Sequence, residues 1–195
     1  MFRRWEKESM QPLNPTLWRT CRVLAGVNRL RLLRRIFEQP GQNVSQLANH
    51  MGIGVSDASQ ELRRLQSRGL LRRTCQGKSV VFLPLPDPQV PSAAPLLKTL
   101  KSVLPGQGQT DESIANMGKA LGHERRIALT CALLRGPRDQ QTLSAWIRAS
   151  PETVHFHLNT MIQSGWVVRT DRRFALNPAR PLLMKTLLRL LRPPP

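Results

Sequence analysis

The 195-residue sequence contains few cysteines, few acidic side chains and no long apolar run. Its three cysteines, Cys21, Cys75 and Cys131, show no paired spacing, which argues against a disulfide framework and fits a reducing cytoplasm. No run of about 18 apolar residues is present, so we expect no membrane span. Charged residues interrupt the first apolar positions, so we also expect no signal peptide. The sequence predicts a cytoplasmic protein that does not cross a membrane.

The scarcity of acidic residues leaves a large positive charge. Thirty Lys and Arg against twelve Asp and Glu give a formal net charge of +18. Residues 1–104 carry 17 basic and 6 acidic side chains, and residues 105–195 carry 13 and 6, so the two halves stand at +11 and +7. Charge of this size attracts polyanions such as nucleic acids. The alternative is a basic, solvated surface that binds no partner.

The sequence also lacks the residue patterns of common catalytic and metal sites. No Ser-His-Asp arrangement, phosphate-binding glycine loop or carboxylate pair stands out, so we expect no enzyme and no cofactor. His155 and His157 would diverge by about 200° on a helix, and His50 and His123 lie in other predicted elements. We therefore expect ordinary polar or capping roles for these histidines and no metal site.

Residues 150–161 are the most clearly delimited helix of the sequence. Ser150 is a good N-cap, and Pro151 is tolerated at the first helical position. The i, i+4, i+7, i+8 spacing predicts a buried face formed by Val154, Leu158, Met161 and Ile162. A short helix over 143–148 precedes this segment, and Gly165 and a β-hairpin over 167–176 follow it. This order predicts a winged helix-turn-helix.

A second copy of this pattern lies 96 positions upstream. Leu143, Ile147, Val154, Leu158, Met161 and Gly165 are matched by Leu47, Met51, Ala58, Leu62, Leu65 and Gly69. A recognition-like helix is predicted over 55–68 and a hairpin over 70–83, and the apolar positions keep their order, which indicates a duplication. We predict a mainly α fold with small β-hairpin wings, in two domains over 1–104 and 105–195.

Further helices are expected around each recognition unit. Asn28 is the expected cap of a helix that ends at Pro40-Gly41. Helices are also expected at 17–24, 96–104, 114–121, 123–135 and about 179–192. A proline-rich connector over 84–95 and a hinge over 105–109 would join the two domains.

The first recognition helix offers side chains suited to DNA. The N-terminal exposed residues of such a helix meet base edges in the major groove. Here the candidates for base contacts are Ser56, Ser59, Gln60 and Arg63, because Gln can pair with adenine and Arg with guanine. The candidates for phosphate contacts are Arg64, Arg72, Arg73 and Lys78. The alternative is that these are ordinary solvated side chains.

The second recognition helix is chemically different, because residues 150–164 contain no Lys or Arg. Its outward candidates for DNA contact are Thr153, His155, Phe156 and Asn159, and its wing adds Arg172 and Arg173. An exposed Phe beside neutral polar residues equally suits a protein partner. If both helices bind DNA, they predict an asymmetric site with half-sites about 34–36 Å apart.

Both units resemble the winged-helix domain of ArsR-type bacterial and archaeal repressors. The resemblance rests on residues 24–33 (LAGVNRLRLL), 120–129 (ALGHERRIAL) and 150–158 (SPETVHFHL). It implies that the helices at the ends of each unit, which join homodimers in that family, here form an intrachain pseudo-dimer; whether two chains pair again stays open. It implies no metal sensing, because residues 44–47 and 141–143 lack the family's cysteines and 179–192 lacks its Asp, His and Glu ligands.

These observations favour a sequence-specific regulator of transcription that binds double-stranded DNA, most simply a repressor that occludes a promoter. It would read an asymmetric site with two non-identical recognition helices. Two other functions remain open. One is a tandem winged-helix scaffold that binds a protein at Phe156, and the other is a nucleoid-associated protein that binds DNA without sequence preference.

Overall fold

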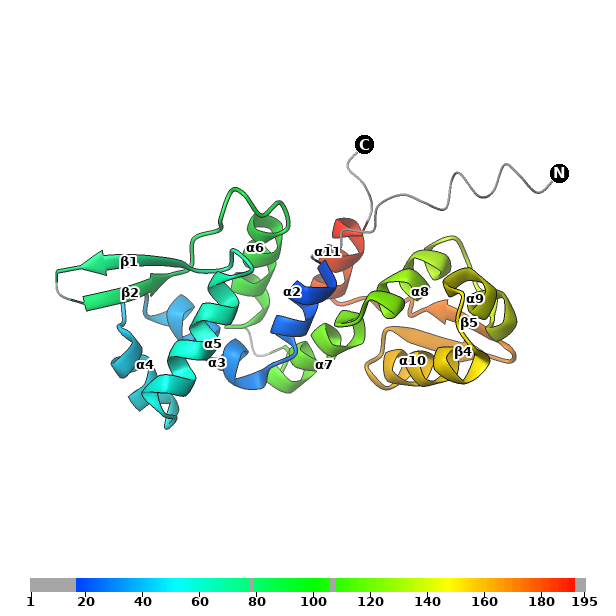
Figure 1. The fold of residues 1–195 in the computed structure, drawn as a ribbon, viewed down its shortest axis with the longest axis horizontal. Helices are drawn as coiled ribbons and strands as arrows, with labels where there is room; N and C mark the ends of the chain where they lie inside the picture. The colour runs from blue at the N-terminus through cyan, green and yellow to red at the C-terminus, as the bar shows by residue number, and fades with distance from the viewer. Residues whose placement is uncertain (1–16, 78, 106–107, 192–195) are drawn as a thin grey trace.

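The computed structural model describes residues 17–77, 79–105 and 108–191. Residues 1–16, Lys78, the middle of the expected hinge and the C-terminal residues 192–195 lie outside this description. The first half contains α2 (Leu17–Leu24), α3 (Val27–Glu38), α4 (Val44–Met51), α5 (Val55–Gln66), β1 (Arg72–Gln76), β2 (Ser79–Leu83) and α6 (Ala93–Val103) (Figure 1). The second half contains α7 (Asp111–Leu121), α8 (Glu124–Leu134), β3 (Arg138–Asp139), α9 (Gln140–Ile147), α10 (Pro151–Gln163), β4 (Val167–Thr170), β5 (Arg173–Leu176) and α11 (Leu182–Leu190).

The described residues are mainly helical, with two small antiparallel sheets, as the sequence predicted. Strands β1 and β2 form a hairpin in which Arg72 lies opposite Leu83 and Gln76 opposite Ser79. In the second sheet, β5 lies between β3 and β4. Within the described part of the chain, no helix is long and apolar enough to cross a membrane.

The ends of the recognition helices follow the signals in the sequence. The Ser150 hydroxyl accepts a hydrogen bond from the Thr153 N–H at 3.3 Å, and Pro151 begins α10. Gly69 and Gly165, 96 positions apart, end the two recognition segments with φ of +70° and +74°. A residue other than glycine is disfavoured in this left-handed region, so both positions suit glycine.

Several expected boundaries were wrong. Asn28 does not cap a helix but lies inside α3, whose N-cap is Gly26. Helix α5 ends at Gln66, two residues early, and α6 begins at Ala93 because Pro95 is tolerated in a first turn. The last helix begins at Leu182, after Pro181. The two-residue strand β3 was missed because it is too short to show a period.

Helices from the two halves pack together in the middle of an elongated molecule. Helix α2 packs against α7, and α6 packs against α11 (Figure 1). Between α6 and α11, the hydroxyls of Thr99 and Thr186 lie 2.8 Å apart. A Cβ on Gly118 of α7 would lie 2.8 Å from the carbonyl oxygen of Cys21. Only glycine therefore allows this close approach of α7 to α2.

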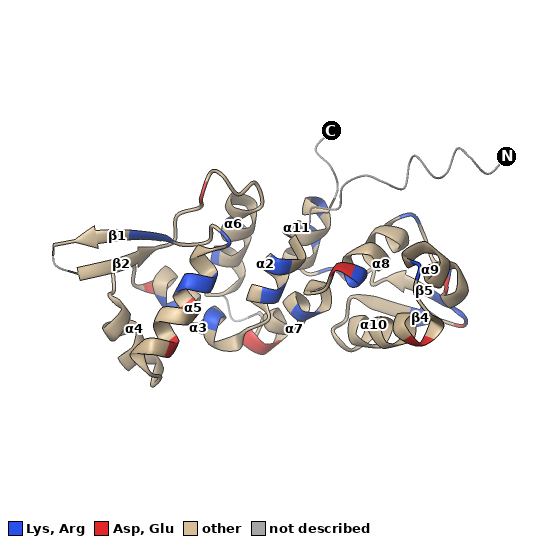
Figure 2. Ribbon diagram, in the orientation of Figure 1, with Lys and Arg blue, Asp and Glu red and all other residues tan. Residues whose placement is uncertain are grey.

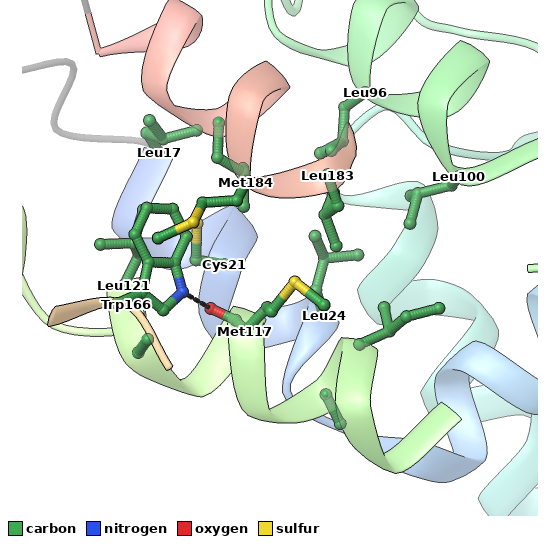
Figure 3. Packing of buried hydrophobic residues seen from close by; sticks show 14 of the residues in the cluster. Leu17, Cys21, Leu24, Leu96, Leu100, Met117, Leu121, Trp166, Leu183 and Met184 are labelled. Carbon is green, nitrogen blue, oxygen red and sulfur yellow. Dashed lines mark hydrogen bonds between the residues drawn. The ribbon is translucent and has the colours of Figure 1, made fainter. Parts of the chain in front are cut away.

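One continuous hydrophobic core includes both halves. In the middle of the molecule, Figure 3 shows Trp166 among side chains of α2, α7 and α11, with Leu96 and Leu100 of α6 farther along the same core. Trp166 is fully buried, and its indole N–H donates to the carbonyl oxygen of Met117 at 3.1 Å. The residues labelled there are Leu17, Cys21, Leu24, Leu96, Leu100, Met117, Leu121, Trp166, Leu183 and Met184.

Candidate nucleic-acid interface

Helix α5 separates a buried face from a polar one. Ala58, Leu62 and Leu65 are fully buried, as the periodicity predicted. On the other side, Ser56, Gln60 and Arg63 are exposed, whereas Ser59 is only half-buried at the edge of this face. The exposed side chains provide hydrogen-bond donors and acceptors of the kind that reads base edges in a major groove.

The carboxylate of Glu61, on α5, forms ion pairs with two arginines. Glu61 accepts a hydrogen bond from Arg29 at 2.6 Å and from Arg64 at 2.7 Å. Arg64, a candidate for phosphate contact, is therefore ion-paired rather than free. Arg29 and Glu61 were missed by the sequence analysis, because the pairing joins residues 32 positions apart on different helices.

The first wing presents arginines beside the recognition helix. Arg72 and Arg73 are exposed on β1, and Arg72 also donates to the carbonyl oxygen of Pro86 at 3.4 Å. Lys78, the candidate at the wing tip, lies outside the described residues. Cys75 is exposed on the same strand. This wing can supply positive charge next to α5.

Helix α10 presents a surface without Lys or Arg, on which Glu152 is the one charged residue. His155, Phe156 and Asn159 are exposed, and Thr153 is half-buried with its hydroxyl 3.2 Å from that of Ser150. The Asn159 amide and the His155 ring nitrogen lie 2.9 Å apart. Phe156 is 65% exposed. A face of this kind can contact bases or a protein, but it supplies no positive charge for phosphates.

The second wing carries its positive charge at the turn. Arg172 and Arg173 are both exposed there. Asp171 makes the turn with a φ of +54°, a left-handed conformation that Asp tolerates better than most residues. The wing therefore carries two exposed cations, although α10 itself has no Lys or Arg.

His157 points away from this surface into a buried cluster. Arg126 Nη1 lies 3.4 Å from His157 Nδ1, and the rings of His123 and His157 are 4.6 Å apart. Burial, together with the neighbouring His123 and Arg126, lowers the pKa of His157 to about 4. Burial also lowers the pKa of His123, which caps α8 through its Nδ1. His123 therefore has the expected capping role, whereas His157 is buried in this cluster.

The remaining titratable groups suggest no reactive centre. Burial raises the pKa of the Cys21 thiol to about 12 and also raises that of Cys131. Among the residues that the structure describes, no group of three or more His, Cys, Asp or Glu side chains is placed to hold a metal ion.

One part of this interface is similar to a known family. No curated protein and no solved structure matches the chain significantly. The region from α3 to the end of β1 does match a family model, and this region includes all of α5. The match names neither the ArsR type nor a second copy. Residues 27–76 match the MarR family, a family of winged helix-turn-helix transcription regulators that bind DNA.

Proposed function

We propose that the chain is a sequence-specific transcriptional regulator that binds double-stranded DNA and represses transcription by occupying a promoter. The observation that carries the proposal is the exposed face of α5, where Gln60 and Arg63 lie opposite a fully buried apolar face. This helix lies within the residues that match a family of DNA-binding regulators.

We further propose that residues 1–104 and 105–195 form two winged-helix domains joined as an intrachain pseudo-dimer. The pairing of α2 with α7 and of α6 with α11 supports this arrangement, because each pair takes one helix from each half. The two recognition helices differ, so the proposed site is asymmetric, with half-sites about 34–36 Å apart. The proposed DNA contacts are Ser56, Ser59, Gln60, Arg63, Arg64, Arg72, Arg73, Lys78, Thr153, His155, Phe156, Asn159, Arg172 and Arg173.

A second function is favoured by one observation on α10. Phe156 is 65% exposed on a helix whose surface lacks Lys and Arg. An exposed aromatic side chain among neutral residues is suited to a protein interface. The alternative is therefore a scaffold that binds DNA through α5 and a protein through α10, or a protein alone.

The test is recovery of genomic DNA fragments by the purified chain at about 150 mM salt, where weak phosphate contacts are screened. We expect a shared, asymmetric motif among the recovered fragments. Gln60→Ala or Arg63→Ala should then weaken discrimination at one half-site by about 1–3 kcal/mol. Lys98→Ala, on the exposed side of α6, is the control. Recovery of unbiased fragments would contradict base readout, and no recovery would favour the scaffold.

A further inference from the structure

A second basic surface lies beside the recognition helix, between α5 and α2. It is an open groove of about 540 Å³. Six of the residues that line it are Trp18, Arg19, Arg22, Arg29, Arg64 and Arg68. In Figure 2, the basic segments of α2 and of the C-terminal half of α5 lie in neighbouring parts of the molecule. We call this feature the α2–α5 groove.

The charge of the α2–α5 groove is only partly neutralised. Glu61 pairs with Arg29 and Arg64. Arg19, Arg22 and Arg68 make no ion pair with any carboxylate in the described part of the chain. Arg19 lies 5.2 Å from the centre of the Trp18 ring, a contact that orients the guanidinium without cancelling its charge. Three arginines are therefore left to attract an anion.

The position of the groove on α5 indicates which anion. At 100° per residue, Gln60 lies at the centre of the exposed face of α5, and Arg64 lies on one flank, in the groove that it shares with Arg68 just beyond the helix end. Arg63 lies on the opposite flank, in a second groove with Arg72 at the base of the wing. A helix in the major groove has one phosphate backbone on each side. Each flank of α5 thus has its own basic groove for one DNA strand.

We propose that the α2–α5 groove binds the phosphates of the DNA strand on the α2 side of the first recognition helix. This inference rests on the proposed function and adds α2 to the DNA-contact elements, although the sequence suggested only a packing role for that helix. Arg19, Arg22 and Arg68 would position the first half-site without reading its bases.

The second repeat shows that the groove is specific to the first. The residues 96 or 97 positions beyond Arg19, Arg22, Arg64 and Arg68 are Asn116, Lys119, Thr160 and Ser164. Only one of them is a cation. Asn116 and Ser164 line a groove of similar volume, about 540 Å³, together with the amides of Gln163 and Asn177. The same place in the duplicated frame is basic in one repeat and mainly neutral in the other.

The experiment measures the salt dependence of binding to a DNA duplex taken from the recovered fragments. The triple variant Arg19→Gln, Arg22→Gln, Arg68→Gln should lose three phosphate contacts, which lowers the slope of log K against log salt by about 2.7. Between 50 and 200 mM salt, its affinity should therefore fall about 40-fold less than that of the unmodified chain. Single variants at Arg19 and Arg22, which are exposed, should each lower the slope by about 0.9.

A variant with the same loss of net charge is the control. Lys98→Gln, Lys101→Gln, Lys185→Gln removes three exposed cations from α6 and α11. An equal change of slope in this control, or an unchanged slope in the arginine variants, would mean that the α2–α5 groove does not bind DNA phosphates. The proposed function would still stand. If the unmodified chain binds no duplex even at 50 mM salt, both the proposed function and the groove are wrong.

Discussion

The two halves of the chain hold an equivalent arginine, Arg29 in α3 and Arg126 in α8, with the same pattern of backbone hydrogen bonds but with different side-chain partners. Arg29 donates to the carbonyl oxygens of Val23 and Arg22, six and seven residues before it. Arg126, 97 positions later, donates to Ala120 and Lys119 at the same two separations. The partner on the recognition helix is Glu61 in the first repeat and His157 in the second.

Under the proposed duplication, this difference marks where the two halves have diverged. Backbone carbonyl groups do not depend on side-chain identity, so both arginines make the same two backbone hydrogen bonds although the surrounding sequences differ. The partner is a side chain, and it changed from a carboxylate to a neutral imidazole. Residues nearby on the same two helices changed as well, from Arg63 and Arg64 to Asn159 and Thr160. The two halves thus share these backbone hydrogen bonds but differ in the chemistry of their exposed side chains.

The largest expected effect is a loss of stability, and it should differ between Trp166 and Leu70, two buried positions that lie 96 residues apart. Both are fully buried, but only Trp166 has a side chain that hydrogen-bonds to α7. Trp166→Ala should lower the free energy of unfolding by about 3–5 kcal/mol, and Leu70→Ala by about 2–3 kcal/mol. Urea denaturation of both variants is the measurement. An equal or larger loss for Leu70→Ala would contradict a special role of Trp166 in the central core.

A somewhat smaller loss of stability is expected from a substitution at the contact between α2 and α7. Gly118→Val should cost about 2–3 kcal/mol, because the new side chain meets the backbone of Cys21, Leu24 and Ala25 rather than movable side chains. Asn116→Val, on the exposed side of the same helix, is the control and should change stability by less than about 0.5 kcal/mol. Similar thermal unfolding of the two variants would show that the contact of α2 with α7 tolerates separation.

A pH-dependent change in stability is expected from His157, in the second half of the chain. The folded-state pKa of His157 is lowered to about 4 from 6.5, so between these values the unfolded chain binds more protons than the folded one. The stability contributed by neutral His157 is therefore present above pH 6.5 and is lost as the pH falls towards 4, by roughly 2 kcal/mol. Denaturation at pH 7.5 and pH 4.5 measures the loss.

Two variants sharpen this prediction. His157→Gln should remove most of the loss, and His50→Gln, at an exposed position of α4, should retain it. His157→Glu places a carboxylate beside Arg126, as Glu61 lies beside Arg29, and should remove the loss as well. A loss that persists in His157→Gln would mean that other groups cause the pH dependence.

The smallest effect is a gain of charge in the second repeat. Asn116→Arg with Ser164→Arg places arginines at the positions that match Arg19 and Arg68. If α10 lies in a major groove, as proposed, the slope of log K against log salt should steepen by up to about 1.8. Asn116→Gln with Ser164→Gln adds bulk without charge and is the control. No change with the arginines would argue that α10 binds a protein instead.

Much of the local structure was predictable because its signals lie within one turn of helix. The cap Ser150, the proline after it and the glycines at 69 and 165 defined the recognition helices within a few residues. The 96-residue repeat also predicted equivalent elements in both halves. Predictions failed where several residues competed for one role, as for the cap assigned to Asn28, or where a strand was as short as β3.

The candidate site was predictable in part. Periodicity placed Gln60, Arg63, Phe156 and Asn159 on exposed faces, because a buried apolar face determines the direction of the opposite one. It could not find the pairing of Arg64 with Glu61 or the basic groove shared with α2. Those depend on helices that are distant in sequence.

The sequence by itself determined the repeated spacing of apolar residues, the positive charge of both halves and the absence of Lys and Arg from α10. Each of these depends only on residue type and short-range spacing. Only the tertiary structure decided that α2 packs on α7 through Gly118, that Trp166 lies in the central core, and that Arg19 and Arg22 share a groove with Arg68. Such contacts depend on how helices from separate parts of the chain meet. Local periodicity gives the face that a helix buries but not the partner that covers it.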